Sequence, residues 1–210
     1  MKKICRNICA AGAILSFMIL SACKPPAVQQ ELGASEALGK ILAEETEHAT
    51  SSKQVVLITP QWKPGASSTV EDSFKAAMKK QKFTVVTIPA NVGDPMHLAG
   101  VGLKPDDFLA ALAQAGGGVV VSLAGPPLLG PGDVNRVAPN HPPVLVVATA
   151  SLGNMIGVPG NRAQVTSLVE AKVIQVAIVD SAAPALPPAA KTDAVHQTFA
   201  ENYSFLRSAN

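Results

Sequence analysis

The chain has 210 residues, of which 15% are charged and only 4% aromatic, so the core of its folded part must consist mainly of small aliphatic side chains. Its 17 Lys and Arg residues nearly balance its 15 Asp and Glu residues, and no basic stripe is interleaved with aromatic residues. Because nucleic-acid binding requires clustered Lys and Arg to neutralise phosphates, the composition argues against a nucleic-acid partner.

A secretory signal is indicated by three basic residues, Lys2, Lys3 and Arg6, followed by an apolar run over residues 8–20. The run is too short to cross a bilayer as a permanent helix. The tetrapeptide Leu20-Ser21-Ala22-Cys23 that ends it resembles the lipobox of bacterial lipoprotein precursors. This resemblance implies that residues 1–22 are removed and that the thiol of Cys23 takes a diacylglycerol, with three acyl chains such as palmitate in the final anchor.

The same resemblance implies a location in the cell envelope. In that family an aspartate directly after the cysteine often signals retention in the inner membrane, whereas this chain has Lys24. We therefore expect the periplasmic face of the outer membrane. Residues 23–30 are predicted as a short lipidated tether, and residues 31–210 as one α/β domain with its core over residues 53–180.

Removal of the signal changes both the charge and the cysteine inventory. The 188 residues from Cys23 onward carry 14 of the 17 basic residues and all 15 acidic residues, so the mature chain is nearly neutral. Cys5 and Cys9 leave with the signal and Cys23 is consumed by lipid. The mature domain therefore has no thiol for a disulfide or a metal.

Five short apolar runs rich in β-branched residues predict the strands: Val55–Thr59, Phe83–Ile88, Val119–Leu123, Val144–Thr149 and Val173–Val179. Continuous rather than alternating hydrophobicity is typical of strands that are covered on both faces, as in a parallel sheet between helical layers. The last run is interrupted by Gln175, which predicts an edge strand. The expected fold is a three-layer α/β domain with a mostly parallel five-stranded sheet, of the flavodoxin-like kind.

The segments between these runs predict helices and loops. Six prolines and three glycines between Gly125 and Pro143 indicate a long ordered loop with at most one helical turn, near residues 133–137. The Pro- and Ala-rich residues 181–190 indicate an extended strap. Helices are expected over residues 31–48, from a capping box at Ser68 and Glu71 to Gln81, from Pro105 to Gly116, from Asn161 to Ala171, and from Thr192 through Val195, Phe199, Tyr203 and Leu206.

The strand pattern also predicts where a ligand would bind. In an open parallel sheet, ligands lie outside the carboxyl ends of the strands, where neighbouring crossovers leave on opposite faces. With the strand order 2-1-3-4-5, that crevice lies between the loops after the first and third strands, with the loop after the fourth alongside. The predicted ligand-binding residues are Thr59, Gln61, Trp62, Gly125, Ser151 and Asn154.

Several of these signals have two interpretations. The indole of Trp62 either stacks on a sugar or another planar ligand, or plugs the top of the sheet. Ser67 and Ser68 either present a helix N-terminus to an anion or simply cap that helix. Asp180, at the end of the fifth strand, either bonds a ligand or starts a turn.

Catalytic and cofactor motifs are absent from the sequence. It contains no dinucleotide-binding glycine fingerprint after the first strand, no P-loop, and no nucleophile elbow around a serine. Asp94 and His97 have a spacing that a metal or an acid–base pair can use, but no third ligand is predicted to converge on them. We therefore predict no metal, no cofactor and no catalytic residue.

The segments KQVVLITP, KFTVVTIP and GGGVVVSLAGPP, within residues 53–180, resemble one lobe of the type I periplasmic binding proteins. Members of that family clamp a ligand between two lobes, whereas this chain has the strands of one, and a homodimer is one way to supply the second. The first hypothesis is a non-enzymatic, lipid-anchored protein that binds a small ligand or a protein partner. The alternatives are a hydrolase-like envelope enzyme, using residues such as Ser151, Asp94 and His97, and a structural or assembly lipoprotein without a pocket.

Overall fold

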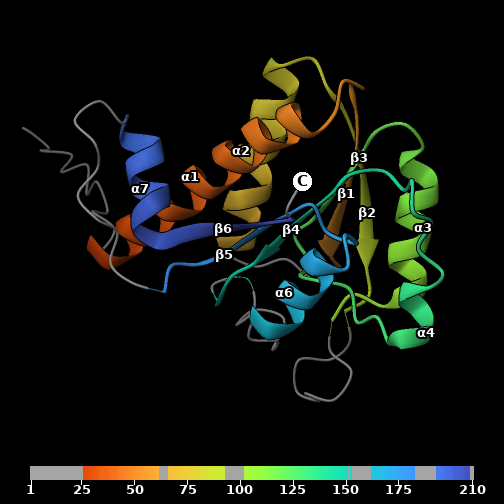
Figure 1. Cartoon of the computed structure of the whole chain (residues 1–210). Helices are drawn as coiled ribbons and strands as arrows, with labels where there is room; N and C mark the ends of the chain where they lie inside the picture. The colour runs from red at the N-terminus through yellow and green to blue at the C-terminus, as the bar shows by residue number, and fades with distance from the viewer. Residues whose placement is uncertain are drawn as a thin grey trace, which may run out of the picture.

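A six-stranded sheet forms the centre of the molecule in the computed structural model, which describes residues 26–61, 66–92, 102–150, 152, 162–182 and 193–208. The strands are β1 (Gln54–Pro60), β2 (Thr84–Ala90), β3 (Val119–Ser122), β4 (Val144–Ala148), β5 (Val176–Asp180) and β6 (Tyr203–Arg207). Their order is β2-β1-β3-β4-β5-β6. The first five strands are parallel, and β6 pairs with β5 in the antiparallel sense (Figure 1). The predicted mostly parallel α/β fold is confirmed.

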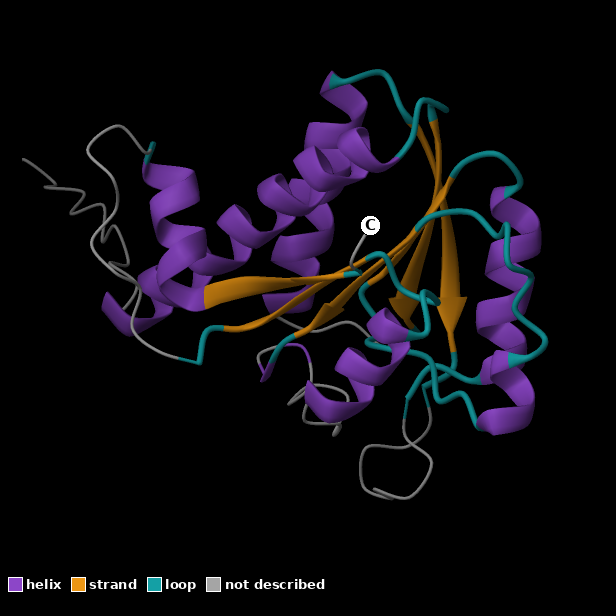
Figure 2. Cartoon of the chain, viewed as in Figure 1, coloured by secondary structure: helices purple, strands orange, loops and turns teal. Residues whose placement is uncertain are grey.

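Helices cover both faces of this sheet, which makes three layers (Figure 2). One face carries α1 (Pro26–Ala49), α2 (Ala66–Lys80) and α7 (Ala194–Asn202), whose apolar side chains form one core cluster with the sheet. The other face carries α3 (Pro105–Ala115), the single turn α4 (Pro131–Val134) and α6 (Arg162–Glu170), which contribute to a second cluster. The single turn in the long Pro-rich loop agrees with the sequence prediction.

Strict alternation along the strands divides the two cores. In β1, Val55 and Leu57 belong to the cluster under α1 and α2, whereas Val56 and Ile58 belong to the cluster under α3. All four are essentially inaccessible to solvent, as is Phe74 of α2. Burying a side chain of this size stabilises the fold by about 1.5–3 kcal/mol. The aliphatic residues of the sheet therefore stabilise the fold through many such contributions.

The helix α3 has the ends that its sequence predicts. Pro105 occupies the first helical turn, with Asp106 and Asp107 beside the positive end of the helix dipole. The helix ends at Gly116, whose φ of 54° is in the left-handed region that glycine adopts readily. Two residues later the backbone passes so close to β1 that a Cβ on Gly118 would lie 2.5 Å from the carbonyl oxygen of Gln54.

The C-terminal segment differs from its prediction. The expected closing helix ends at Asn202, and the chain continues as strand β6. Phe199 packs on Tyr203 and Phe205, with ring centroids 5.6 and 5.0 Å apart. The spacing that suggested a longer helix therefore reflects contacts across the junction of α7 and β6.

The prediction of which strands form the sheet edges is also corrected. β5 is an inner strand because β6 pairs with it, and the side-chain carbonyl of Gln175 accepts a hydrogen bond from the backbone N–H of Val144. The edge opposite β6 is β2, most of whose residues are only partly buried. Gln175 is polar because it satisfies the backbone at the start of β4, and it does not mark an edge.

Two helices begin earlier than predicted. α1 starts at Pro26, so most of the segment expected to be a tether is helical. α2 starts at Ala66, which places Ser68 inside the helix rather than at its cap, and Glu71 forms an ion pair with Lys75 at 2.6 Å. The expected strap lies almost entirely outside the described residues.

Candidate functional site

The position predicted for a ligand, at the carboxyl edge of the sheet, is a point where the helices diverge. After β1 the chain enters α2 on one face, and after β3 it enters α4, whose Val134 packs on the opposite face. β1 and β3 are neighbours in the sheet. Because consecutive crossovers leave on opposite sides here, this is the position at which open α/β sheets bind ligands. The strand order assumed from the sequence holds for the five parallel strands.

Thr59, near the end of β1, is the most informative residue of this edge. It is fully buried, and its hydroxyl has no hydrogen-bond partner in the structure. Alternation along β1 directs its side chain to the same face as Leu57, the face that α2 covers. A buried hydroxyl without a partner costs about 1–3 kcal/mol, which a ligand or an ordered water molecule that bonds to it would recover.

The loop after β3 is closed by its own hydrogen bonds. The hydroxyl of Ser122 donates to the carbonyl oxygen of Gly125 at 2.7 Å, and the N–H of Leu123 donates to the carbonyl oxygen of Ile58 at 2.9 Å. Gly125 is buried and has a φ of +80°. Gly125 therefore allows a tight turn beside the end of β1. At this positive φ, residues other than glycine, asparagine and aspartate would be strained.

Asp180, at the end of β5, organises the loop that follows β4. Its carboxylate accepts a hydrogen bond from the N–H of Ala150 at 2.6 Å, and its carbonyl oxygen lies 3.4 Å from a guanidinium nitrogen of Arg162. Asp180 therefore positions the start of the segment that leads to the predicted residue Ser151. It ties two strand ends together, and it does not only start a turn.

The other predicted site residues are described in part or not at all. The N–H of Gln61 donates to the carbonyl oxygen of Ala90 at 2.9 Å, which extends the pairing of β1 and β2, and its side chain is exposed. Ser67 belongs to the first turn of α2, as Ser68 does. Trp62, Asp94, His97, Ser151 and Asn154 lie outside the described residues.

A small cavity at the same edge was not predicted. It measures about 300 Å³ and lies between the first turns of α1 and the junction of β5 and β6, with Gln30, Glu31, Asp180, Asn202 and Tyr203 in its wall. We call it the edge cavity. Most of its lining comes from α1, and Asn202 and Tyr203 complete it where α7 ends and β6 begins. A continuous C-terminal helix, which the sequence predicts, does not form this wall.

A second hollow, the three-helix groove, lies away from the carboxyl edge between α1, α2 and α7. Its volume is about 710 Å³, and its wall combines small residues of α2, such as Ala76 and Ala77, with charged residues of all three helices. His196 bridges two of these charges, with ring nitrogens 3.1 Å from Glu44 and 2.9 Å from Asp193. The imidazole donates to both carboxylates only when both of its nitrogens carry hydrogen.

The start of α7 is held by the same Asp193. Its carboxylate caps the helix by accepting hydrogen bonds from the N–H groups of Val195 and His196. The bond from the backbone of His196, followed by the bond from its side chain, lowers the pKa of Asp193 below the usual range. At the end of β6, Arg207 donates a hydrogen bond to Glu45, which raises the pKa of Arg207. Together with the contact between His196 and Glu44, this bond links α1 to both ends of the C-terminal segment.

The groove also contains a buried atom without a partner, the side-chain oxygen of Gln81. Gln81 is partly exposed, and rotation about its side-chain bonds can bring the amide to water, whereas Thr59 is fully buried on a strand. The hydroxyl of Thr59 is therefore the stronger sign of a missing ligand. Across the described ranges, no three His, Cys, Asp or Glu side chains are placed to hold a metal ion.

None of the helices in the described part of the chain is long and apolar enough to span a membrane. No protein-family model matches the sequence, and no curated protein matches it.

Comparison with solved structures returned periplasmic solute-binding proteins. One is the solute-binding protein of an ABC transporter from Agrobacterium vitis bound to alpha-D-tagatopyranose, with a TM-score of 0.45 and 21% identity over 70% of this chain and 45% of that one. Another is a periplasmic sugar-binding protein of an ABC sugar transporter from Legionella pneumophila, with a TM-score of 0.41 and 13% identity over 71% of this chain and 49% of that one. The matched regions span less than half of each neighbour, and at these TM-scores neither assigns a ligand to this chain.

Proposed function

We propose that the chain is a lipid-anchored protein of the cell envelope whose single α/β domain binds a small ligand at the carboxyl edge of its sheet and performs no catalysis. The observation that carries the ligand-binding part is the fully buried hydroxyl of Thr59 without a partner, beside the point where the crossovers diverge. Thr59, Gln61 and Gly125 come from the described strand ends. We propose that Trp62, Ser151 and Asn154 complete the site from the adjoining loops.

The lipid-anchored part rests on Leu20-Ser21-Ala22-Cys23 and on the basic and apolar residues before it. Three acyl chains exceed what stable membrane attachment requires, since two lipid signals already suffice. With Lys24 after the cysteine, we propose the periplasmic face of the outer membrane. Metabolic labelling with a clickable fatty acid should mark the wild type and leave Cys23→Ser unlabelled and unprocessed. If Cys23→Ser is cleaved and released normally, the anchor is not at Cys23.

Ligand binding is tested on the lipid-free domain, expressed from Lys24 onward. Thermal unfolding is followed across a panel of sugars and small polar metabolites, since a ligand that binds only the native state raises the transition temperature in proportion to its occupancy. We expect at least one compound class to raise it in a saturable, concentration-dependent manner. A flat response over the whole panel, with the domain folded by circular dichroism, would contradict the ligand-binding proposal in favour of a structural lipoprotein.

A further inference from the structure

The first turn of α1 lies at the carboxyl edge of the sheet. α1 enters β1 through a short connection and therefore runs opposite to that strand, so its first residues are at the end where the parallel strands finish (Figure 1). The edge cavity confirms this placement, because Ala27 and Gln30 share its wall with Asp180 and Tyr203. The N-terminal end of α1 therefore lies at the same edge of the sheet as the candidate ligand site.

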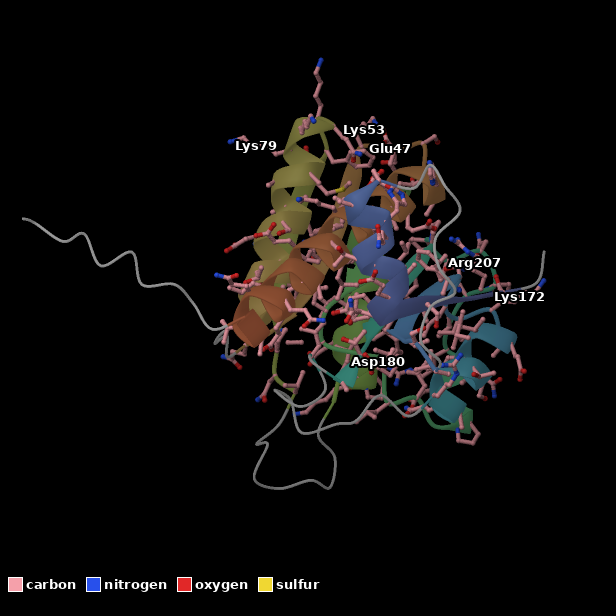
Figure 3. The ribbon with its side chains drawn as sticks, turned by 90° about the vertical axis from the view of Figure 1, so that its left-hand side faces the viewer. Glu47, Lys53, Lys79, Lys172, Asp180 and Arg207 are labelled. Carbon is pink, nitrogen blue, oxygen red and sulfur yellow. The ribbon has the colours of Figure 1, made fainter. Side chains whose placement is uncertain are left out.

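The reach of the tether is short compared with the domain. Cys23 precedes Pro26 by three residues, which span at most about 11 Å when fully extended. The 24 residues of α1 are about 36 Å long, and they lead to the opposite edge. Figure 3 shows Glu47, Lys53 and Lys79 at that far end and Asp180 in the other half of the molecule. An acylated Cys23 can therefore bring the carboxyl edge to a membrane. The tether is too short for the domain to turn over and place its far end on the same membrane.

The surface of the first turn agrees with contact to lipid. Val28 is the one large hydrophobic side chain within the described residues that is substantially exposed, at 40%. It lies five residues after Cys23. An isolated exposed valine needs no explanation elsewhere, but next to an acyl anchor it is positioned to enter the apolar boundary of the bilayer.

The side of α1 is unsuited to lying flat on a bilayer. The helix contains five glutamates and a single lysine, Lys40. Anionic lipids would repel such a helix along its length. Lysines that would attract such lipids lie at the far end. Lys79 and Lys82 are joined by a backbone hydrogen bond in the turn after α2, and Nζ of Lys53 lies 4.1 Å from the ring centroid of Phe83. Lysines are attracted to an anionic surface, but the tether is too short to let that end of the domain reach the membrane.

We infer that the domain stands end-on at the membrane, with the first turn of α1 and the carboxyl edge of the sheet facing the lipid surface and the Lys53, Lys79 and Lys82 end facing away. The inference rests on the lipid anchor of the proposed function. Its consequence is that the candidate ligand site lies on the side of the domain next to the bilayer, so a ligand approaches it along the membrane surface.

Because the mature chain lacks any other cysteine, single labels can be placed cleanly. The experiment uses lipidated protein in vesicles of phosphatidylethanolamine and phosphatidylglycerol that carry a headgroup-attached fluorescence quencher. A fluorophore is attached at one of four exposed positions, through Gln29→Cys, Ala182→Cys, His48→Cys or Lys79→Cys. Gln29 and Ala182 are at the inferred membrane-facing end, and His48 and Lys79 are at the other.

We expect strong quenching at Gln29→Cys and Ala182→Cys, and at least severalfold weaker quenching at His48→Cys and Lys79→Cys. Equal quenching at Gln29→Cys and His48→Cys would show that α1 lies flat and would overturn the inference. Stronger quenching at Lys79→Cys would overturn it by showing the inverted orientation. If the protein does not float with the vesicles at all, the lipid anchor itself fails, and the inference fails with it. Ligand binding by the lipid-free domain is independent of all these outcomes.

Discussion

The carboxyl edge of the sheet and the three-helix groove are both hollow, but their polar groups are partnered differently. The groove is the larger, at about 710 Å³ against about 300 Å³ for the edge cavity, and its Glu44 and Asp193 are both engaged by His196. The groove also has a buried oxygen without a partner, that of Gln81, but the Gln81 side chain is partly exposed. Thr59 lies at the carboxyl edge outside the wall of the edge cavity, and its hydroxyl is fully buried and has no partner. An unpartnered polar group on a fully buried side chain, rather than the size of a hollow, therefore indicates where a ligand is missing.

The largest expected effect is on the free energy of unfolding, and it concerns Gly39 beside the three-helix groove. Gly39 lets α1 approach α2 beside the groove, because a Cβ there would lie 2.5 Å from the carbonyl oxygen of Val70. We expect Gly39→Ala to lower the free energy of unfolding by about 1–3 kcal/mol, measured by urea denaturation. The substitution should leave ligand affinity at the carboxyl edge unchanged.

Gly33 of the same helix provides the matched control. A Cβ at Gly33 meets no atom within 4 Å, so Gly33→Ala should stabilise the protein by roughly the helix-propensity difference of about 1 kcal/mol. If both substitutions stabilise equally, the close contact between α1 and α2 is not present in solution.

A smaller effect is expected for Gly125, the glycine at the carboxyl edge. Its φ of +80° is strained for alanine, so Gly125→Ala should lower the free energy of unfolding by about 1–2 kcal/mol. Unlike Gly39→Ala, it should also weaken ligand binding, because it disturbs the loop beside Thr59. Gly117→Ala, at a position with ordinary φ and free space, should change stability by less than about 0.5 kcal/mol in either direction. Unchanged ligand affinity in Gly125→Ala would separate that loop from the site.

These regions were predictable from the sequence to different degrees. Continuous apolar runs gave the parallel strands, and therefore the position of the crevice, because burial on both faces leaves a strong local pattern. The five residues of β6 carry a weaker pattern, since Tyr203 and Leu206 also fit a helical spacing with Phe199. The missed strand hid the edge cavity. The unsatisfied state of Thr59 depends on which atoms surround its hydroxyl, and no sequence pattern encodes that.

The smallest expected effect is the loss of stability at acidic pH through Asp193, in the wall of the three-helix groove. Asp193 has a lowered pKa in the folded protein, so the stability that its ionised form contributes is present above the ordinary carboxyl pKa near 4 and is lost as the pH falls through the lowered value. In the variant Asp193→Asn, the side-chain amide at the cap still accepts the backbone bonds but cannot titrate. The melting temperature of the wild type should therefore exceed that of Asp193→Asn at pH 6, and the difference should shrink below pH 4 and vanish only when the pH is below the lowered pKa of Asp193 in the folded protein. A difference that stays the same size from pH 6 to the lowest pH at which both proteins remain folded would mean that the charge of Asp193 is not its source.

We propose above that the carboxyl edge around Thr59 is the ligand site. This proposal is tested most directly by titrating the best compound of the panel into the wild type and three variants under calorimetry. Thr59→Val keeps the shape and removes the hydroxyl, Thr46→Val removes a buried hydroxyl that already donates to the carbonyl oxygen of Leu42 at 2.7 Å, and Ala76→Leu narrows the groove. We predict an affinity loss of about tenfold or more for Thr59→Val alone, the size of one hydrogen bond of about 1.4 kcal/mol. Wild-type affinity in Thr59→Val together with a loss in Ala76→Leu would rule out a site at Thr59 and place the ligand in the three-helix groove.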